Sequence, residues 1–312
     1  MPHWTAADIP DQSGVTAIVT GGNSGIGYFT ALELARKGAR VVLACRSVAK
    51  AEAAAQKIRA AVPSALVEVQ QLDLAWQASV HKFAGKFAAS GRPLHLLINN
   101  AGVMALPKRT ETPDGFEMQF GTNVLGHFAL TGLLLPAIVS AGQSASAPPR
   151  IVTLSSLAHM DGAIHLDDLH LAHEYTPWKA YRQSKLGDLM LALELDRRLR
   201  AKSIRILSVA AHPGIAETSL FTRDAVRWQQ PFTRFTGKLI SLVLNTAERG
   251  ALPTLYAATD AAAEPGGYYG PQGLREARGY PGPARIAGRA KKKDIAAALW
   301  EKCEALTGVS FP

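Results

Sequence analysis

Thr16-Ala17-Ile18-Val19-Thr20 runs directly into Gly21-Gly22-Asn23-Ser24-Gly25-Ile26-Gly27, and this passage says most about the architecture of the chain. Its first part is a short apolar run of the kind that forms a buried strand. Apolar side chains then recur near helical spacing, and Gly38 predicts the end of that helix. The sequence therefore predicts a strand that enters a helix through a glycine-rich turn.

This turn is typical of a phosphate-binding site. Glycines permit a tight turn and a close approach of the backbone to a pyrophosphate. The N-terminus of the helix that follows adds free N–H groups and the positive end of the helix dipole. The spacing is G-x-x-x-G-x-G rather than the standard G-x-G-x-x-G, so a purely structural turn is the alternative. We predict a dinucleotide site at Gly21, Asn23, Ser24, Gly25, Ile26 and Gly27.

Strands and helices alternate along the rest of the chain. We predict strands at 40–45, 66–72, 94–99, 150–155 and 205–210 and helices at 49–61, 78–90, 115–139 and 180–200. Parallel strands need crossover helices, which cover both faces of the sheet. The prediction is an α/β fold, a doubly wound and mainly parallel sheet with helices on both faces, in one domain over residues 1–312.

Three segments stand apart from this alternation. The long connections 159–179 and 214–246 follow strands, at the edge where open α/β sheets bind ligands, so we expect them to be substrate-side insertions. The C-terminal extension 266–312 begins with a stretch rich in Gly and Pro, 266–288, which we expect to be irregular.

Composition excludes several classes of protein. Hydrophobic residues make up 47% of the 312 and charged residues 19%, as in an ordinary globular protein. Only two cysteines, Cys45 and Cys303, argue against a disulfide framework and favour a reducing compartment. Residues 1–11 do not resemble a signal peptide, and the longest apolar stretch, 129–139, is about half of what a membrane helix requires. We expect a cytoplasmic protein without a membrane anchor.

The net charge of +9 raises the alternative of a nucleic-acid-binding protein. The basic residues are spread along the chain, however, and the one run, 289–293, is interpreted as a solvated surface. We therefore predict no nucleic-acid partner, and a basic balance also suits a polyanionic cofactor.

The end of the second predicted strand bears on the choice of cofactor. An acidic residue there would bind the ribose 2′-hydroxyl of NAD. The chain instead has Cys45-Arg46-Ser47, and a guanidinium beside a hydroxyl suits a 2′-phosphate. NADP(H) is the predicted cofactor, with Arg46 and Ser47 as ligands of the phosphate. The alternative is that Arg46 is only a solvated surface residue.

Tyr181-Arg182-Gln183-Ser184-Lys185 is the strongest sign of catalysis. The tyrosine and the lysine are four residues apart and share a helix face. A free phenol ionises near pH 10, and a lysine cation beside it favours the phenolate, which makes the phenol a usable acid and base. Ser156 is predicted to hydrogen-bond the substrate oxygen, and Asn123 to hold a water that links the lysine to solvent. The alternative for Tyr181 alone is a core tyrosine.

Histidines at 159, 165, 170 and 173 cluster in one insertion and raise the possibility of a metal. They lack a helical ligand spacing with a matched carboxylate, so we predict a polar loop and no metal site.

Together these motifs resemble the short-chain dehydrogenase/reductase family, from about Gly14 to Thr218. The resemblance implies a Rossmann-like sheet of seven strands, a catalytic tetrad and pairing into a homodimer or homotetramer. The implied tetrad is Asn123, Ser156, Tyr181 and Lys185. Further residues are implied to bind the cofactor: Tyr181 and Lys185 again, with Asp73, Leu74, Asn100, Ala101, Gly102, Pro213, Gly214, Ile215 and Thr218.

Within that family, the residues at 44–46, 99–104, 123–128 and 156–159 are similar to the retinol dehydrogenase and protochlorophyllide reductase-like branch. That branch implies NADPH and lipophilic carbonyl substrates. We expect an NADP(H)-dependent oxidoreductase that interconverts the carbonyl and alcohol of an apolar substrate. Reduction of a C=C bond and a non-catalytic NADP-binding sensor are the alternatives. An apolar substrate wall is predicted from Leu220, Phe221, Val226, Trp228, Phe232 and Phe235, which otherwise pack the loop onto the sheet.

Overall fold

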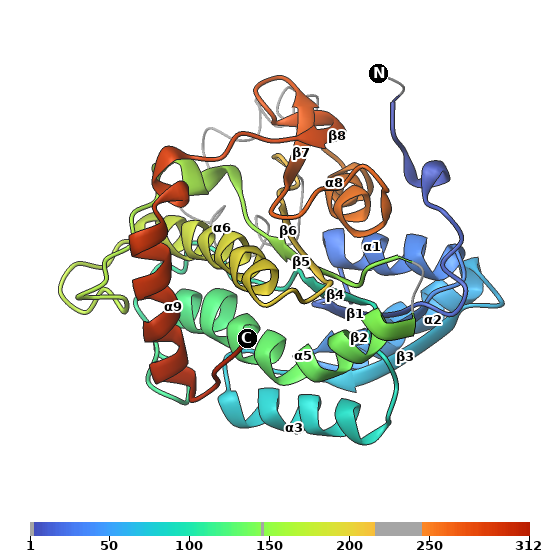
Figure 1. Ribbon diagram of the computed structural model, residues 1–312, viewed down its shortest axis with the longest axis horizontal. Helices are drawn as coiled ribbons and strands as arrows, with labels where there is room; N and C mark the ends of the chain where they lie inside the picture. The colour runs from blue at the N-terminus through green and yellow to red at the C-terminus, as the bar shows by residue number, and fades with distance from the viewer. Residues whose placement is uncertain (1–2, 145–146, 216–244) are drawn as a thin grey trace, which may run out of the picture.

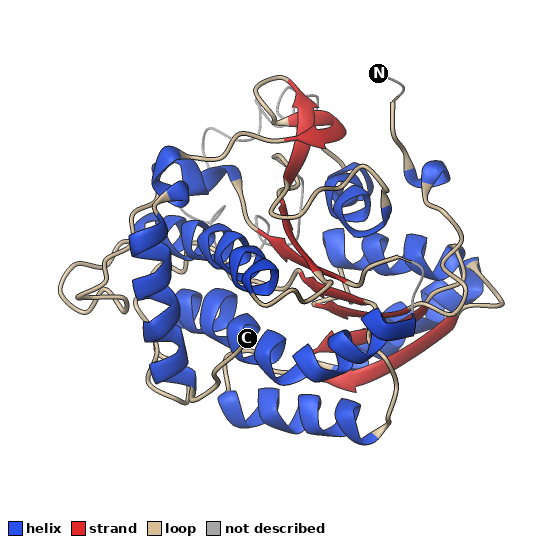
Figure 2. Cartoon of the chain, in the orientation of Figure 1, coloured by secondary structure: helices blue, strands red, loops and turns tan. Residues whose placement is uncertain are grey.

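One mainly parallel sheet organises the chain (Figures 1 and 2). In the computed structural model, which describes residues 3–144, 147–215 and 245–312, the sheet has eight strands in the order β3-β2-β1-β4-β5-β6-β7-β8. The strands are β1 (Thr16–Thr20), β2 (Arg40–Cys45), β3 (Leu66–Gln71), β4 (Leu96–Asn99), β5 (Arg150–Leu154), β6 (Leu207–Ala211), β7 (Tyr268–Gly273) and β8 (Arg278–Pro283). All neighbouring strands are parallel except β7 and β8, which form an antiparallel hairpin at one edge.

Helices cover both faces of this sheet, as crossover connections between parallel strands require. One face carries α1 (Gly25–Arg36), α2 (Val48–Ala61) and α8 (Ala247–Thr259). The other carries α3 (Gln77–Ala89), α5 (Gly126–Ser144) and α6 (Pro177–Ala201), and α9 (Lys293–Thr307) packs on α5 and α6 from outside. Shorter helical turns are η1 (Ala6–Asp8), α4 (Met118–Phe120), η2 (Gly121–Leu125), η3 (Leu157–Asp161) and η5 (Gly288–Lys291).

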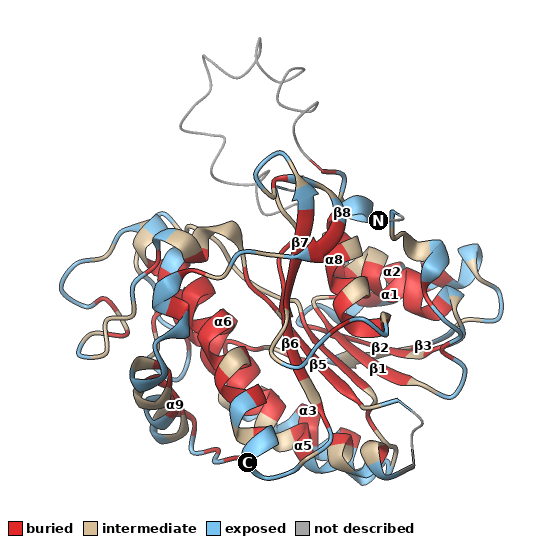
Figure 3. Cartoon of the chain, turned by 45° about the horizontal axis from the view of Figure 1, so that its top comes forward, coloured by how far each residue is buried: buried red, intermediate tan, exposed pale blue. Residues whose placement is uncertain are grey.

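The core consists of two apolar layers, one on each face of the sheet. Alternate residues of β1 belong to different layers: Ile18 packs with the layer under α3, α5 and α6, and Ala17 and Val19 pack with the layer under α1 and α8. Because both faces are covered, every residue of β1 is buried (Figure 3). The continuous apolar run at 16–20 is therefore the expected signature of a central parallel strand.

The helical stretch Met118–Gln143 is long and apolar enough to cross a membrane, but 67% of its most apolar window is buried inside the fold. It contains α5, which packs against the sheet and α3. The apolar stretch 129–139 is thus part of a mostly buried helix.

The predicted alternation of strands and helices and the doubly wound sheet are confirmed, but the expectation of an irregular stretch at 266–288 is wrong. β7 extends the parallel sheet beside β6, with Ala210 opposite Tyr268, and β8 turns back along β7. Proline is tolerated in β8 because it is the edge strand, and Pro271 of β7 lies beyond the two residues that pair with β6. The sheet thus has seven parallel strands, as implied by the resemblance, plus one antiparallel strand.

Candidate active site

A pocket of about 290 Å³ lies at the carboxyl ends of the parallel strands. The segments that follow β1 to β6 all contribute to it, and α6 adds two side chains. The pocket spans the point where the chain order reverses, between β1 and β4, which is where doubly wound sheets bind ligands. The predicted residues that line it are Gly21, Asn23, Ser24, Gly25, Ile26, Gly27, Arg46, Asp73, Leu74, Asn100, Ala101, Gly102, Tyr181, Lys185 and Pro213.

The glycine-rich turn opens α1 toward this pocket. Gly21 and Gly25 have φ of +65° and +55°, a left-handed conformation that favours glycine. Ser24 is the N-cap of α1, yet its side chain makes no capping hydrogen bond, so the hydroxyl does not occupy the free N–H groups of the first turn. This helix N-terminus can accept a phosphate without displacing a side chain.

Asn100 joins the two strands at the switch point. Its Nδ2 donates to the Thr20 carbonyl (2.7 Å), and its backbone N–H donates to Thr20 Oγ1 (2.9 Å). A side chain at Gly27 would clash with the Asn100 amide, so this glycine is needed for close packing. The asparagine thereby fixes the glycine-rich turn relative to the end of β4.

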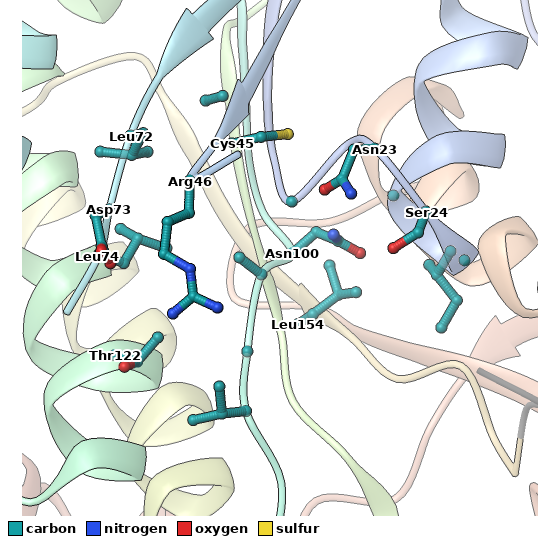
Figure 4. A pocket seen from close by; sticks show the side chains of 18 of the residues that line it. Asn23, Ser24, Cys45, Arg46, Leu72, Asp73, Leu74, Asn100, Thr122 and Leu154 are labelled. Carbon is teal, nitrogen blue, oxygen red and sulfur yellow. The ribbon is translucent and has the colours of Figure 1, made fainter. Parts of the chain in front are cut away.

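Arg46 extends from the end of β2 over the pocket, with Asp73 and Leu74 on one side and Asn100 on the other (Figure 4). The residue is exposed, and the guanidinium can reach a ligand from solvent. Ser47 does not line the pocket. It is the N-cap of α2, and its Oγ accepts a hydrogen bond from the backbone of Lys50 (3.4 Å).

Tyr181 and Lys185 lie on α6, where their spacing places both in the pocket wall. Thr176 caps the helix and Pro177 occupies its first turn, which fixes where α6 begins. Tyr181 is 8% exposed, and the ring of Trp178 meets it edge-on at 5.9 Å. The tyrosine is thus almost fully buried, and it also lines the pocket.

Lys185 Nζ donates to the Leu154 carbonyl (2.8 Å) and to Asp188 Oδ2 (2.8 Å). Burial alone would lower the pKa of Lys185, but the Asp188 carboxylate and Tyr181 outweigh it and raise that pKa. The lysine is therefore held as a cation next to the tyrosine. The same burial raises the pKa of Asp188 to about 6, despite the attraction of Lys185.

Asn123 lies in the π-helical turn η2, immediately behind the pocket wall. Its Oδ1 accepts from the Val103 N–H (2.8 Å), and its Nδ2 donates to the Val103 carbonyl (3.0 Å) and to Ser184 Oγ (3.0 Å). A Cβ added at Gly102 would be 3.2 Å from Asn123 Oδ1 and 3.8 Å from Lys185 Nζ. The Asn123 amide and the Lys185 ammonium therefore both lie next to this glycine. Single π-helical turns are frequent at functional sites.

The two serines after β5 have different surroundings. Ser155 is buried, lines the pocket and donates from Oγ to the Lys185 carbonyl (2.7 Å). Ser156 is the N-cap of η3, half-buried, and its Oγ accepts from the Ala158 N–H (3.2 Å). The structure therefore ties Ser155 to α6. Ser156 lies next to the pocket lining but outside it, and among the described residues its hydroxyl donates no hydrogen bond.

Pro213 lines the pocket, with Gly214 and Ile215 next to it in the chain but outside the lining. Thr218 and the residues of the predicted apolar wall lie outside the described residues. Sequence reasoning missed the lining residues Ala44, Cys45, Leu72, Val103, Thr122, Leu154 and Ser155 as part of the pocket. Each of them lies within two positions of a predicted residue, and all but Thr122 lie at or just after the end of a strand, which is the signal that could have found them.

The histidines of the 159–179 insertion do not converge. His159 is buried against Tyr268, with ring centroids 5.3 Å apart, and His170 stacks on Phe116 at 5.5 Å. In the part of the chain that the structure describes, no group of three His, Cys, Asp or Glu side chains could hold a metal ion.

The comparisons with known proteins agree with this geometry. Residues 15–227 match the short chain dehydrogenase family, and the chain therefore belongs to it. It belongs to the branch that contains the retinol dehydrogenases. It is 41% identical to retinol dehydrogenase 13 of Homo sapiens over 301 residues, which cover 96% of this chain and 86% of that protein. It is 42% identical to polyprenol dehydrogenase of Mus musculus over 300 residues, with the same coverage of 96% and 86%.

A solved structure, that of an uncharacterized protein from Mycobacterium Paratuberculosis, has a TM-score of 0.80 and 40% identity. The match covers 99% of each chain, so this structure has the same fold throughout.

Proposed function

We propose that this oxidoreductase uses NADP(H) to interconvert the carbonyl and the alcohol of an apolar substrate, with Tyr181 as the acid and base. The observation that carries the proposal is that α6 brings Tyr181 and Lys185 into the same pocket as the glycine-rich turn and Arg46. A phosphate-binding end and a proton-transfer end thereby share one cavity.

The residues at one end suit a dinucleotide. The free N–H groups at the start of α1 are matched to a phosphate, since Ser24 leaves them uncapped. Arg46 and the lack of a carboxylate at the end of β2 favour a 2′-phosphate over a bare ribose hydroxyl, which supports NADP(H). When bound, the nicotinamide supplies or accepts the hydride.

The residues at the other end suit proton transfer to oxygen. In the reducing direction, the Tyr181 hydroxyl donates its proton to the oxygen of the carbonyl as the carbon receives the hydride. The Lys185 cation, held by Asp188 and Leu154, stabilises the phenolate that remains. Ser156, whose hydroxyl proton has no acceptor among the described residues, donates a hydrogen bond to the developing alkoxide. In the oxidising direction each of these steps runs in reverse.

The class of substrate is proposed from two observations. The relatives named retinol dehydrogenase and polyprenol dehydrogenase carry names of long apolar alcohols. The exposed ring of Trp178 lies beside Tyr181, where it can contact an apolar substrate.

The test is oxidation of NADPH and of NADH by the purified protein with a panel of aldehydes and ketones of increasing chain length. The proposal predicts turnover with NADPH that rises with the apolar length of the carbonyl compound. Product analysis with an enone separates alcohol formation from reduction of the C=C bond. Tight NADPH binding with no turnover on any compound would favour a non-catalytic binding protein instead.

A further inference from the structure

The turn between β7 and β8 holds three consecutive residues other than glycine in the left-handed region. Leu274, Arg275 and Glu276 have φ of +45°, +54° and +65°. Each such residue is strained by roughly 1 kcal/mol or more, and such strain persists only where the surroundings fix it. The question is which contacts fix this turn.

Glu276 provides those contacts through both carboxylate oxygens. Oε1 accepts from the Arg285 backbone N–H (3.1 Å) and from Arg285 Nε (3.0 Å). Oε2 lies 3.2 Å from His212 Nε2. The Glu276 side chain is only 13% exposed, so the left-handed turn buries a carboxylate against the segment that follows β6.

His212 lies beside that carboxylate, in electrostatic contact with it, although Nε2 makes no hydrogen bond among the described residues. Its Nδ1 accepts a hydrogen bond from the Gly214 N–H (3.2 Å), so the neutral ring carries its proton on Nε2, which faces Glu276. The imidazole is completely buried, and Gly270 leaves the space for it, because any side chain there would clash with the ring. The ring thus lies between β7 and the 274–276 turn.

The same turn contacts the rest of the segment at 213–215. Ile215 N–H donates to the Ala277 carbonyl (2.9 Å), and a side chain at Gly214 would clash with that carbonyl. Asn245 closes the arrangement, since its Nδ2 donates to the carbonyls of Pro213 and Ala277, both at 3.3 Å. Pro213 in turn lines the pocket.

We propose that Glu276 is a positioning residue: through His212 it holds the 212–215 segment in the place where Pro213 completes the cofactor pocket. This rests on the proposed function only for the identity of the cofactor. The strained turn brings the Glu276 carboxylate next to His212, and Arg285 donates hydrogen bonds to Oε1, the oxygen that lies away from the histidine. Loss of the carboxylate takes away the anion beside His212 Nε2 and frees Gly214 and Ile215 to move.

The experiment compares Glu276→Gln and Glu276→Ala with the wild type, with Glu301→Gln as control, since Glu301 is an exposed residue of α9 remote from this turn. Hydrogen exchange of the free protein is measured at Gly214 and Ile215, and dissociation constants of NADPH and NADH are measured by calorimetry. We expect faster exchange at both amides in both Glu276 variants. We also expect the NADPH dissociation constant to rise about tenfold, the size of one lost interaction with a charged group, with no change in the control.

Unchanged exchange and unchanged affinity in Glu276→Gln and Glu276→Ala would overturn the proposal. If Glu276→Ala does not fold, Glu276→Gln and Arg285→Gln decide the matter by the same measurements. Arg285→Gln removes the side-chain donor to Oε1 at an exposed position and leaves the backbone donor in place. If the wild type binds neither nucleotide, the proposed function fails, while exchange in the free protein still decides the role of Glu276.

Discussion

Lys185 Nζ lies 2.8 Å from Asp188 Oδ2, and both side chains are almost fully buried. The lysine that lies beside Tyr181 in the pocket thus forms a buried ion pair with a carboxylate three positions later on α6. An ion in such a place is costly when its partner is removed, because the remaining charge has no solvent to stabilise it. Asp188 therefore bears on both the fold and the charge state of the site.

Removal of one partner of this pair is expected to destabilise the protein strongly. Asp188→Leu should lower the free energy of unfolding by about 3–5 kcal/mol, and Lys185→Met in the same chain should restore most of that loss. Urea unfolding of the two single variants and the double variant measures the coupling. Glu174→Gln, which breaks the exposed ion pair with Lys179, is the control and should have no measurable effect. If the loss of unfolding free energy in the double variant equals the sum of the losses in the two single variants, the two side chains do not act as a buried pair.

Arg46 is expected to select the cofactor. Arg46→Ala should raise KM for NADPH about 10- to 100-fold, because one or two hydrogen bonds between charged groups are lost, and should leave KM for NADH nearly unchanged. Steady-state kinetics with both nucleotides measure this. Arg36→Ala, on the far end of α1, is a control for the loss of a positive charge. An equal loss for both nucleotides would mean that Arg46 does not contact a 2′-phosphate.

The adjacent serines are expected to separate activity from stability. Ser156→Ala should lower kcat about 100-fold, because it removes a donor to the alkoxide, and should lower the free energy of unfolding only by the roughly 1 kcal/mol of the lost η3 cap. Ser155→Ala should mainly lower stability, since its buried hydroxyl holds the Lys185 carbonyl. Kinetics and urea unfolding of both variants test the assignment. A large kcat loss in Ser155→Ala alone would reverse the two roles.

The protein is expected to lose stability in mild acid. Burial lowers the pKa of His127 and of His212 to about 4 in the fold, whereas the unfolded chain takes up protons near pH 6.5. The unfolded state therefore binds more protons between pH 6.5 and 4, and the free energy of unfolding falls as pH drops through that window, by on the order of 3 kcal/mol for each histidine.

His127→Gln should remove part of that dependence, and His81→Gln, at an exposed position of α3, should not. Urea unfolding at a series of pH values from 4 to 8 provides the comparison. Asp188, whose pKa burial raises to about 6, acts in the opposite direction, so the difference between variant and wild type isolates the histidine. Parallel curves for His127→Gln and the wild type would contradict a buried neutral His127.

Much of the site was accessible from the sequence because its residues follow strands in regular order. The glycine-rich turn, Arg46, Asn100 and the pair on α6 were predicted and lie in one pocket. Each of these residues could be predicted because it follows an apolar strand directly or shares a helix face with another. The order of elements in a doubly wound sheet then brings these segments together.

Contacts between distant segments could not be predicted. Glu276 meets His212 only because β7 pairs with β6, and glycine-rich residues at 266–288 gave no strand signal. Asp188 carries no motif in the sequence, and its burial depends on α9 and the sheet. Both residues act through tertiary neighbours, which local pattern does not encode.

The most direct test of the account is the rate of NADPH-dependent reduction of an apolar aldehyde by the wild type and by Tyr181→Phe. Loss of the proton donor should lower kcat by about 10²- to 10⁴-fold, while the NADPH dissociation constant changes little. A Tyr181→Phe variant that reduces the aldehyde at the rate of the wild type would contradict the role of Tyr181 as the acid and base.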